Sequence, residues 1–379
     1  MNFEFTETHQ LIRETARKFA DEKVAPDSIE RDEKEQFPYE AVKELGELGF
    51  MGMMVPEEWG GAGLDTVSYV LAMEEISRVD ASVGVIMSVN NSLVCYGINQ
   101  YGTQDQKERY LRDLATGKKL GAFALSEPEA GSDASNQRTT ATRDGDCYVL
   151  NGTKNWITNG STADLVLVMA ATDKSKGPKG ISTFIVEKGT PGFAVAKKET
   201  KLGIRSSDTV SLSFTDCRVP VANRIGDEGA GFRFAMKTLE GGRIGIAAQA
   251  LGIAQACLDA SLKYAKERKA FDHPIAELQA IQFKIADMAT NIEAAQALIL
   301  RATSLKDSNK PFGSEAAMAK LFASKTAVQS ALESIQIHGG YGYVREYLVE
   351  RYLRDAKITE IYAGTSEIQR IVIARSLLK

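Results

Sequence analysis

The sequence predicts an α+β protein of three consecutive parts: an N-terminal helical domain over residues 1–118, a middle antiparallel β domain over residues 119–225 and a C-terminal helical bundle over residues 226–379. Apolar residues recur at helical spacing in the first part. Short alternating runs between turn residues fill the second, and long helical patterns return in the third. A chain of 379 residues is also too long for one compact core, which favours several domains.

The first part is predicted to be helical between residues 8 and 117, because its apolar side chains fall on one helix face. The opening groups are Leu11, Ile12, Ala16 and Phe19, then Val42, Leu45 and Leu48. The turn-rich stretch PEEWGGAGLD (56–65) interrupts the pattern, and VSYVLAMEEISRVD (67–80) resumes it.

The middle part is predicted to be β structure because its apolar runs are short and separated by turn residues. These runs are DLVLVMAAT (164–172), GISTFIVEK (180–188) and TVSLSFTDCRV (209–219). In the third run Val210, Leu212 and Phe214 alternate with Ser211, Ser213 and Thr215. A period of two is that of a half-buried antiparallel strand. After the turn-rich GDEGAGF (226–232), helical patterns run on to residue 379, long enough to pack as a bundle.

Charge and cysteine usage exclude several functional classes. A formal charge of −4, with acidic and basic residues interspersed, argues against nucleic acid or an anionic membrane as the main partner. The N-terminal residues carry charges throughout and lack an apolar signal core, and we expect no membrane-spanning stretch. We therefore expect a cytoplasmic protein with free thiols and no metal site. The cysteines, which occur singly, are Cys95, Cys147, Cys217 and Cys257.

Common catalytic and nucleotide motifs are missing from the sequence. No GxGxxG follows a predicted strand and opens a helix, and no GxxxxGK[ST] occurs. The sequence also lacks GxSxG and HExxH, which disfavours the commonest serine hydrolases and zinc proteases. A cofactor site, if one exists, must be built in another way.

The stretch TEIYAGTSEIQR (359–370) contains a predicted helix start. Ser366 and Gln369 have the spacing of a capping box, and Gly364 gives the turn before it conformational freedom. Position 363 therefore lies on a constrained bend at the positive end of a helix, where enzymes often place an anion or a working carboxylate. The residue there is Ala363.

Several ordered motifs together resemble the acyl-CoA dehydrogenase family over nearly the whole chain, closest to its short-chain, butyryl-CoA type. They are ALSEPEAGSDASNQRTTA (124–141), WITNG (156–160), GGRIGIAAQALG (241–252), ERKAF (267–271), QIHGGYGY (336–343) and RDAKITEIYAGTSEIQR (354–370). The resemblance implies the same three-part fold with a C-terminal four-helix bundle, assembled as a homotetramer. It also implies one FAD per subunit, with the flavin ring between the β domain and the bundle.

By resemblance the FAD residues form two groups. Around the ring, Trp156 would stack on the flavin and Thr158 would place a hydroxyl near N5, as a hydride-accepting ring requires. The other residues implied there are Phe123, Leu125, Ser126, Gly131 and Ser132. The adenine dinucleotide end would reach a neighbouring subunit at Arg268, Phe271, Gln336, Gly339 and Gly340, while Ile361, Tyr362, Thr365 and Glu367 complete the site. Asp272 stands where the family usually has glycine, which puts the local turn in question.

The acyl-CoA residues implied by the resemblance are Ser132, Glu240, Arg243, Gln249, Thr359, Tyr362 and Gly364. Glu240 would accept from a pantetheine amide and Arg243 would donate to the CoA moiety. Gln249 and Thr359 match residues that form the bottom of the acyl pocket in short-chain members. An acyl chain of about four carbons is therefore expected to fit.

The implied reaction is α,β-desaturation of an acyl-CoA thioester, which needs a carboxylate base opposite the flavin. In the closest relatives this base is a glutamate at the position of Ala363. A second base position in the family corresponds to Gly242, and Glu240 lies about 200° around the helix from it. The backbone N–H of residue 363, which polarises the thioester carbonyl in the family, is retained. We therefore expect a desaturase scaffold whose base has been deleted, with much reduced activity.

Three other interpretations remain open from the sequence. The chain could be a naturally silent flavoprotein that binds acyl-CoA, a flavin oxidase or oxygenase on the same fold, or a desaturase of branched short acyl-CoA with another base. If the ordinary partner is retained, electrons would pass to electron transfer flavoprotein. The exact acyl group, the direction of flux and the origin of Ala363 are not decided by the sequence.

Overall fold

The N-terminal part of the chain is helical, as the apolar spacing predicts. The structure, a computed structural model, describes residues 4–378. Asp65 starts the central helix of this part by accepting a hydrogen bond from the Ser68 N–H at 2.8 Å, so one carboxylate satisfies a free helix-end donor. The helices are α1 (Glu7–Phe19), α2 (Ser28–Lys34), α3 (Tyr39–Glu47), α4 (Thr66–Val79), α5 (Ala81–Ser88), α6 (Tyr96–Tyr101), α7 (Gln104–Gln106) and α8 (Arg112–Ala115), with η1 (Ala20–Val24), η2 (Glu57–Trp59), η3 (Val89–Cys95) and η4 (Lys107–Leu111) between them.

Two residues of the predicted apolar faces lie on the surface. Leu11 is 63 % exposed and Leu48 is 41 % exposed, whereas Ala16, Phe19 and Leu45 are buried as expected. Leu48 is the C-cap residue of α3 and so follows its last helical residue, and Leu11 lies within α1. The stripe is therefore narrower than the sequence pattern indicates.

Two helical runs are long and apolar enough to cross a membrane, contrary to the expectation from the sequence. They are Ala81–Tyr101 and Gly231–Glu267, and their apolar windows are 89 % and 83 % buried inside the protein. Burial within the fold accounts for the apolar composition, because a core helix is hydrophobic all round.

The middle part forms one sheet with the strand order β6-β7-β3-β2-β4-β5-β8, and β1 pairs with β4. Most neighbours are antiparallel as predicted, but β1 and β2 both run parallel to β4, so the sheet is mixed. The parallel pairs arise because β4 follows long connections rather than tight hairpins from β1 and β2. The strands are β1 (Gly121–Ala124), β2 (Thr140–Asp144), β3 (Cys147–Thr158), β4 (Leu165–Ala171), β5 (Ile181–Glu187), β6 (Phe193–Lys198), β7 (Thr209–Pro220) and β8 (Arg224–Ile225), with η5 (Lys174–Gly180) and η6 (Val221–Asn223) between them.

The C-terminal part is again helical and is organised around α9 (Gly231–Glu267), which packs against α4 and α11. Gly252 permits this approach, because a Cβ there would lie 2.3 Å from the carbonyl oxygen of Glu74 on α4. The other elements are β9 (Lys269–Ala270), β10 (His273–Pro274), η7 (Ile275–Glu277), α10 (Gln279–Asp307), α11 (Gly313–His338), η8 (Gly339–Tyr343), α12 (Val349–Thr359) and α13 (Ser366–Leu377). The domain limits at residues 118 and 225 stay a prediction.

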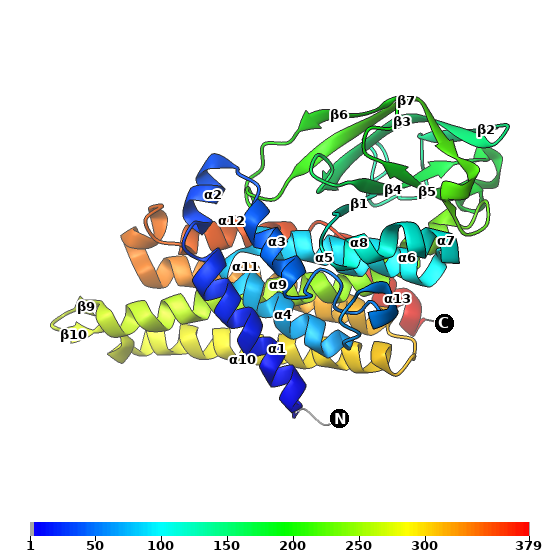
Figure 1. Ribbon diagram of the computed structural model, residues 1–379. Coiled ribbons are helices and arrows are strands. Elements are labelled where there is room, and N and C mark those ends of the chain that lie inside the picture. Colours follow the sequence, from blue (N-terminus) through cyan, green and yellow to red (C-terminus); the bar gives the residue numbers. More distant parts are fainter. Residues whose placement is uncertain (1–3, 379) are drawn as a thin grey trace.

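The sheet lies above one end of the helical layer, and the β9–β10 hairpin projects from the opposite end (Figure 1). Helix α13 lies at the same end as the sheet. The two groups of predicted FAD residues are thus widely separated within one chain.

Candidate functional site

Trp156 is unusual on the sheet because its side chain is 62 % exposed. The pairing of β3 with β7 shifts register between Lys154 and Ile157, and Trp156 has a left-handed backbone with φ of 62°. A bulge of this kind turns a side chain out of the alternation of its strand. Thr158 ends the same strand and is half-buried. An exposed indole beside a hydroxyl fits a planar aromatic cofactor, so this surface suits a flavin ring.

The other ring-facing residues predicted from the sequence surround the same strand ends. Phe123 is half-buried on β1, and its ring stacks on Phe234 with the centroids 6.4 Å apart. Leu125 is buried, and the Ser126 carbonyl accepts a hydrogen bond from the Asn155 N–H at 2.9 Å, next to Trp156. Gly131 and Ser132 lie exposed in the following loop.

A buried ion pair holds this loop in place. The Lys154 ammonium, 0 % exposed, lies 2.7 Å from a Glu127 carboxylate oxygen and donates to the Leu125 carbonyl at 3.1 Å. Glu127 also accepts a hydrogen bond from the Thr139 N–H at 3.1 Å. Burial lowers the pKa of Lys154 to about 8. Burial alone would raise the pKa of Glu127, but the Lys154 charge keeps it below its usual value.

The predicted dinucleotide-end residues gather at the opposite end of the molecule. Arg268 follows the last residue of α9, and its guanidinium lies over the Tyr341 ring, 5.6 Å from the centroid. Gly339 has φ of 59° and ψ of −134°, a conformation that only glycine adopts freely. The remaining members of this group, all exposed, are Phe271, Gln336 and Gly340. These residues come together with each other and not with Trp156.

The hairpin turn that contains Asp272 forms despite the absence of glycine. Ala270 pairs with His273, so Phe271 and Asp272 are the two turn residues, with φ of 55° and 69°. A two-residue turn with both φ values positive favours Asn, Asp or Gly. Aspartate is therefore a tolerated substitute for the glycine that the family usually has.

The turn before α13 places Ala363 in a strained conformation. Its φ is 53°, and Gly364 follows with φ of 91°. A left-handed conformation costs a residue with a Cβ about 1–2 kcal/mol, so surrounding contacts must maintain it. The Gln369 side chain supplies two, donating to the carbonyl oxygens of Ala363 at 3.3 Å and Gly364 at 2.7 Å.

The predicted capping box is wrong by one residue. Thr365, and not Ser366, caps α13: its hydroxyl accepts a hydrogen bond from the Ile368 N–H at 3.3 Å. Thr365 has the extended backbone that a cap requires, whereas Gln369 is turned inward and is used by the turn. Glu367 is exposed in the first turn of α13, and Ile361 is 49 % exposed before the bend.

A buried lysine lies beside this turn, and the charge of a buried arginine acts on that lysine. The Lys320 ammonium on α11 donates to the Gly364 carbonyl at 2.8 Å, and the Lys320 residue is 0 % exposed. Burial, with the positive charge of Arg243, lowers the pKa of Lys320 to about 7, against the opposing charges of Glu360 and Glu367. Arg243 is 7 % exposed, its Nε has no hydrogen-bond partner, and burial lowers its pKa. Within the described part of the chain, no carboxylate lies within ion-pairing distance of Lys320 or Arg243.

The carboxylates near the turn are engaged elsewhere. Glu240 pairs with Lys237 at 3.1 Å and Glu360 pairs with Lys357 at 2.7 Å. Glu367 faces Arg370 at 3.9 Å. Each of these three carboxylates therefore has a cationic partner on its own helix or next to it.

Both predicted floor residues are buried, and one of them is hydrogen-bonded to the turn. Gln249 is fully buried on α9; its side-chain nitrogen donates to the Ala81 carbonyl at 2.7 Å, and its oxygen accepts from the Tyr362 hydroxyl. Burial raises the pKa of Tyr362, so its hydroxyl stays protonated. Thr359 is also buried, and its hydroxyl donates to the Ala356 carbonyl at 2.7 Å.

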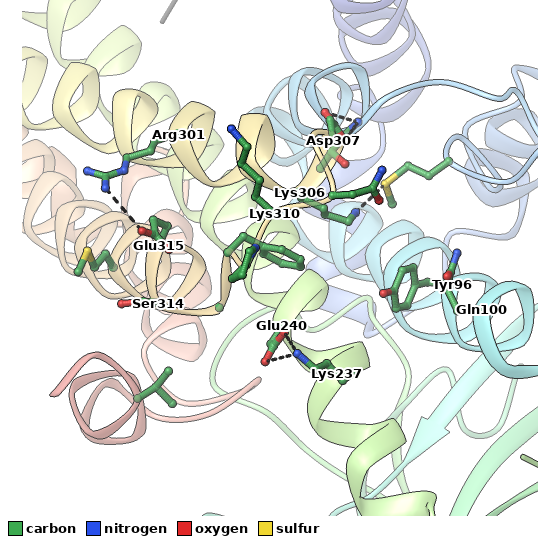
Figure 2. A pocket seen from close by; sticks show the side chains of 18 of the residues that line it. Tyr96, Gln100, Lys237, Glu240, Arg301, Lys306, Asp307, Lys310, Ser314 and Glu315 are labelled. Atoms are coloured by element: carbon green, nitrogen blue, oxygen red, sulfur yellow. Dashed lines mark hydrogen bonds and ion pairs between the residues drawn. The ribbon is translucent and has the colours of Figure 1, made fainter. Parts of the chain in front are cut away.

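A pocket of about 1180 Å³ opens beside the N-terminal half of α9. Figure 2 shows side chains from α6, α9, α10 and α11 around it, with Glu240 on one wall and Lys306 on another. The Lys306 ammonium lies 3.3 Å from the Met54 sulfur and 5.7 Å from the Tyr96 ring centroid, and burial lowers its pKa to about 8. Over residues 4–378, the lining cations that have no carboxylate in ion-pairing distance are Lys306, Lys310 and Arg375.

The sequence did not predict the buried charged residues that hold the loops of the candidate site, namely Lys154, Glu127 and Lys320. Glu127 lies within the motif at 124–141, and Lys154 lies two residues before the motif at 156–160. A charged residue in a polar stretch gives no sign in the sequence that it is buried. Lys320 follows small apolar residues in EAAMAKLFA (315–323), and a lysine on the apolar face of a helix is a usable signal. In the part of the chain that the structure describes, no cluster of His, Cys, Asp or Glu could hold a metal.

Family models match the chain in three consecutive stretches. The acyl-CoA dehydrogenase N-terminal domain matches residues 6–118, the middle domain matches residues 122–217, and the C-terminal domain matches residues 229–378.

Individual relatives are similar over nearly the full length. A mouse protein named short-chain specific acyl-CoA dehydrogenase, mitochondrial, is 55 % identical over 376 residues, covering 99 % of this chain and 91 % of that protein. The solved butyryl-CoA dehydrogenase of Megasphaera elsdenii is 49 % identical with a TM-score of 0.99, covering 100 % of both chains. A chain in a structure described as the electron transferring flavoprotein of Acidaminococcus fermentans is 51 % identical with a TM-score of 0.99, again covering 100 % of both.

Proposed function

The chain belongs to the acyl-CoA dehydrogenase family, whose members are FAD flavoproteins, and from that premise we propose that it binds a short-chain acyl-CoA thioester on a desaturase scaffold that lacks its base. The observation that carries the proposal is the turn around Ala363. Its strained backbone is held by Gln369 and by the buried Lys320, and the positive charge of Arg243 acts on Lys320. A site with this charge suits a carboxylate, and the side chain present is a methyl group.

Trp156 and Thr158 would hold the flavin ring, and bound FAD would supply a hydride acceptor. The Ala363 N–H would polarise the thioester carbonyl, and the contact between Gln249 and Tyr362 would limit the length of the acyl chain. With no carboxylate at position 363, the α-proton has no acceptor in reach. We expect the rate to fall by roughly 10²–10⁴, the usual contribution of a general base.

Helix α9 provides the axis along which the acyl-CoA would lie. Glu240, Arg243 and Gln249 follow one another along it, and a rise of about 1.5 Å per residue separates the first from the last by about 13 Å. The CoA end would then lie at the pocket beside Glu240, and the acyl end at Gln249. Lys306, Lys310 and Arg375 offer unpaired positive charge for the phosphates of CoA.

Partners and assembly follow from the same family membership. Electron transfer flavoprotein would accept the electrons, supported by the similarity to a chain of the Acidaminococcus structure. A homotetramer is supported by the exposed dinucleotide-end residues, since a cofactor shared between chains requires a neighbour; Phe271 is 85 % exposed. We place the protein in the cytoplasm, supported by its bacterial relatives and its four free thiols.

A naturally silent acyl-CoA-binding flavoprotein is the second candidate, because the same geometry binds ligand without a base. A branched-chain desaturase with another base is less well supported, since the nearby carboxylates Glu240, Glu360 and Glu367 are engaged with cations.

Binding of butyryl-CoA to the FAD-loaded chain tests the placement of the substrate. Lys306→Met should weaken binding roughly tenfold, the scale of a hydrogen bond to a charged group, and should reduce its salt dependence. Butyryl-pantetheine, which lacks the nucleotide, should bind both chains equally. Lys325→Met, which removes an exposed lysine of α11, is the matched control. An unchanged affinity for butyryl-CoA in Lys306→Met would place the CoA elsewhere.

A further inference from the structure

We propose that a linking segment, residues 202–208 between β6 and β7, fixes the flavin-facing strand end relative to the turn that carries Ala363, with Asp355 as the positioning residue at its contact with α12. The inference rests on the proposed function in one respect, because it takes Thr158 and Ala363 as the residues that face the flavin and the substrate. It goes beyond that function by assigning a role in the reaction to residues that touch neither ligand.

The linking segment leaves the sheet and reaches the helices at α12 (Figure 1). The Asp355 carboxyl accepts a hydrogen bond from the Ile204 N–H at 2.5 Å, and the Arg354 guanidinium donates to the Leu202 carbonyl at 3.3 Å. Gly203 lies directly against α12, because a Cβ there would be 2.2 Å from the Arg354 carbonyl oxygen. Three consecutive residues of the segment therefore contact two consecutive residues of one helix.

Ile204 is held in a backbone conformation that isoleucine rarely adopts. Its φ is 43°, and a left-handed conformation is an outlier for a β-branched residue. The side chain is 3 % exposed and belongs to the same buried apolar cluster as Ala356 of α12. Strain of about 1–3 kcal/mol persists only where the surrounding structure over-determines the backbone. The hydrogen bond to Asp355 is one of the contacts that maintain it.

The other end of the linking segment is hydrogen-bonded to the flavin-facing strand end. The Asp208 carbonyl accepts from the Asn159 N–H at 2.9 Å, and the Asp208 carboxylate accepts from the Ser161 N–H at 2.7 Å. Thr209, the next residue, pairs with Thr158 in the ladder between β3 and β7. The segment therefore ends beside the residue that is proposed to place a hydroxyl near the flavin.

Helix α12 connects the contact at Asp355 to the turn. Asp355 lies one helical turn before Thr359, the last residue of α12. The Tyr362 N–H donates to the Ile358 carbonyl at 3.1 Å, so the turn begins as a continuation of the helix. A shift of α12 would carry Ala363 with it. A misplacement of about 1 Å can lower a reaction rate by about 10², so this contact would affect the reaction from a distance.

Two variants break the contact from opposite sides. Asp355→Ala removes the acceptor, and Asp355→Asn keeps an acceptor oxygen and so serves as the conservative rescue. Ile204→Gly frees the segment, because glycine adopts a positive φ without strain, and it leaves Asp355 beside Arg351 at 3.8 Å. This variant keeps the test valid if the unpaired Arg351 prevents Asp355→Ala from folding. Asp287→Ala, which removes an exposed aspartate of α10, is the control.

The first measurement is amide hydrogen exchange in the FAD-loaded chain without acyl-CoA, followed in residues 156–160 and 360–364. Asp355→Ala and Ile204→Gly should each speed exchange roughly tenfold in both stretches, the scale of one hydrogen bond to a charged group. Asp355→Asn and Asp287→Ala should exchange like the parent. Faster exchange confined to α12 and the linking segment, or no change in either stretch, would overturn the proposal, because the contact would then be only local support.

The second measurement is anaerobic bleaching of the flavin band by butyryl-CoA in Ala363→Glu, with and without Asp355→Ala. The rate at saturating butyryl-CoA should fall by roughly 10–10² with Asp355→Ala, while the half-saturating concentration and the FAD content change little. Asp355→Asn should restore most of the rate. Equal rates with and without Asp355→Ala would overturn the positioning role. Failure of the proposed function would look different, because Ala363→Glu itself would then not bleach while the exchange result would still stand.

Discussion

The Tyr362 hydroxyl donates a hydrogen bond to the side-chain oxygen of Gln249, so the turn that carries Ala363 is joined directly to the middle of α9. Gln249 is held from the other side by the Ala81 carbonyl at 2.7 Å. These contacts link α5, α9 and the turn, the three regions that would form the end of the proposed acyl site. The length of acyl chain accepted should therefore depend on Gln249.

Gln249→Ala should shift binding toward longer acyl chains. Removing the amide opens space beside Tyr362, and a pocket contact on the scale of a methylene is worth about 1–3 kcal/mol. We expect the affinity for octanoyl-CoA relative to butyryl-CoA to rise roughly tenfold, measured by perturbation of the flavin spectrum. Gln255→Ala on the same helix is the control. An unchanged ratio would show that Gln249 does not limit the chain.

Trp156→Ala should weaken FAD binding and leave the apoprotein almost as stable as before. The indole is 62 % exposed and so contributes little to the core, whereas a stacking contact between rings contributes about 0.5–1.5 kcal/mol. We expect a dissociation constant for FAD about two- to tenfold higher. It can be followed by the quenching of flavin fluorescence during reconstitution. A large loss of apoprotein stability with unchanged FAD affinity would make Trp156 a purely structural residue.

Lys154→Met should be strongly destabilising, and adding Glu127→Gln should restore much of the loss. The single change leaves a buried carboxylate 1 % exposed without its cation, which typically costs about 3–5 kcal/mol. The double change removes both charges. Denaturant unfolding of the parent, the two single variants and the double variant forms a complete cycle. Additive losses would mean that the two residues do not act as a pair.

Asp355→Asn should flatten the pH dependence of stability. Burial raises the pKa of Asp355 to about 7, against the opposing charge of Arg351. The folded chain therefore keeps a proton that the unfolded chain has lost, and this stabilising contribution disappears as the pH rises from about 4 through about 7. Asp32 and Asp80 add to the shift, and asparagine can still accept from the Ile204 N–H.

We expect the parent to lose on the order of 1–3 kcal/mol more than Asp355→Asn between pH 5 and pH 8. Urea unfolding at the two pH values measures the difference. Parallel losses in the parent and the variant would show that Asp355 titrates normally.

The fold could be predicted closely from periodicity. The alternation in residues 209–219 corresponds to β7, and the long apolar patterns after residue 230 correspond to α9 and α11. Parallel pairing of β1 and β2 with β4 could not be predicted, because strand order depends on connections that no local pattern records. The apolar composition of Ala81–Tyr101 likewise does not show whether the neighbour is lipid or protein.

Short local features of the candidate site could be predicted from the sequence, but the long-range contacts that hold them in place could not. The bend at Ala363 was predicted from the helix start that follows it, whereas the role of Trp156 beside a flavin comes from the resemblance and stays a prediction. The role of Lys320 depends on which carbonyl its ammonium reaches, and that carbonyl is 44 residues away in sequence. The cap of α13 was misplaced because Thr365 and Ser366 are both good caps, and only the backbone conformation distinguishes them.

The measurement that tests the central claim most directly is anaerobic addition of butyryl-CoA to the FAD-loaded protein, in this chain and in Ala363→Glu, while the flavin band is followed. We predict bleaching that is faster in Ala363→Glu by roughly 10²–10⁴, together with comparable binding of butyryl-CoA to both. Comparable bleaching in both chains would show that another residue removes the proton, and no bleaching in either would show that the scaffold is silent for a reason other than Ala363.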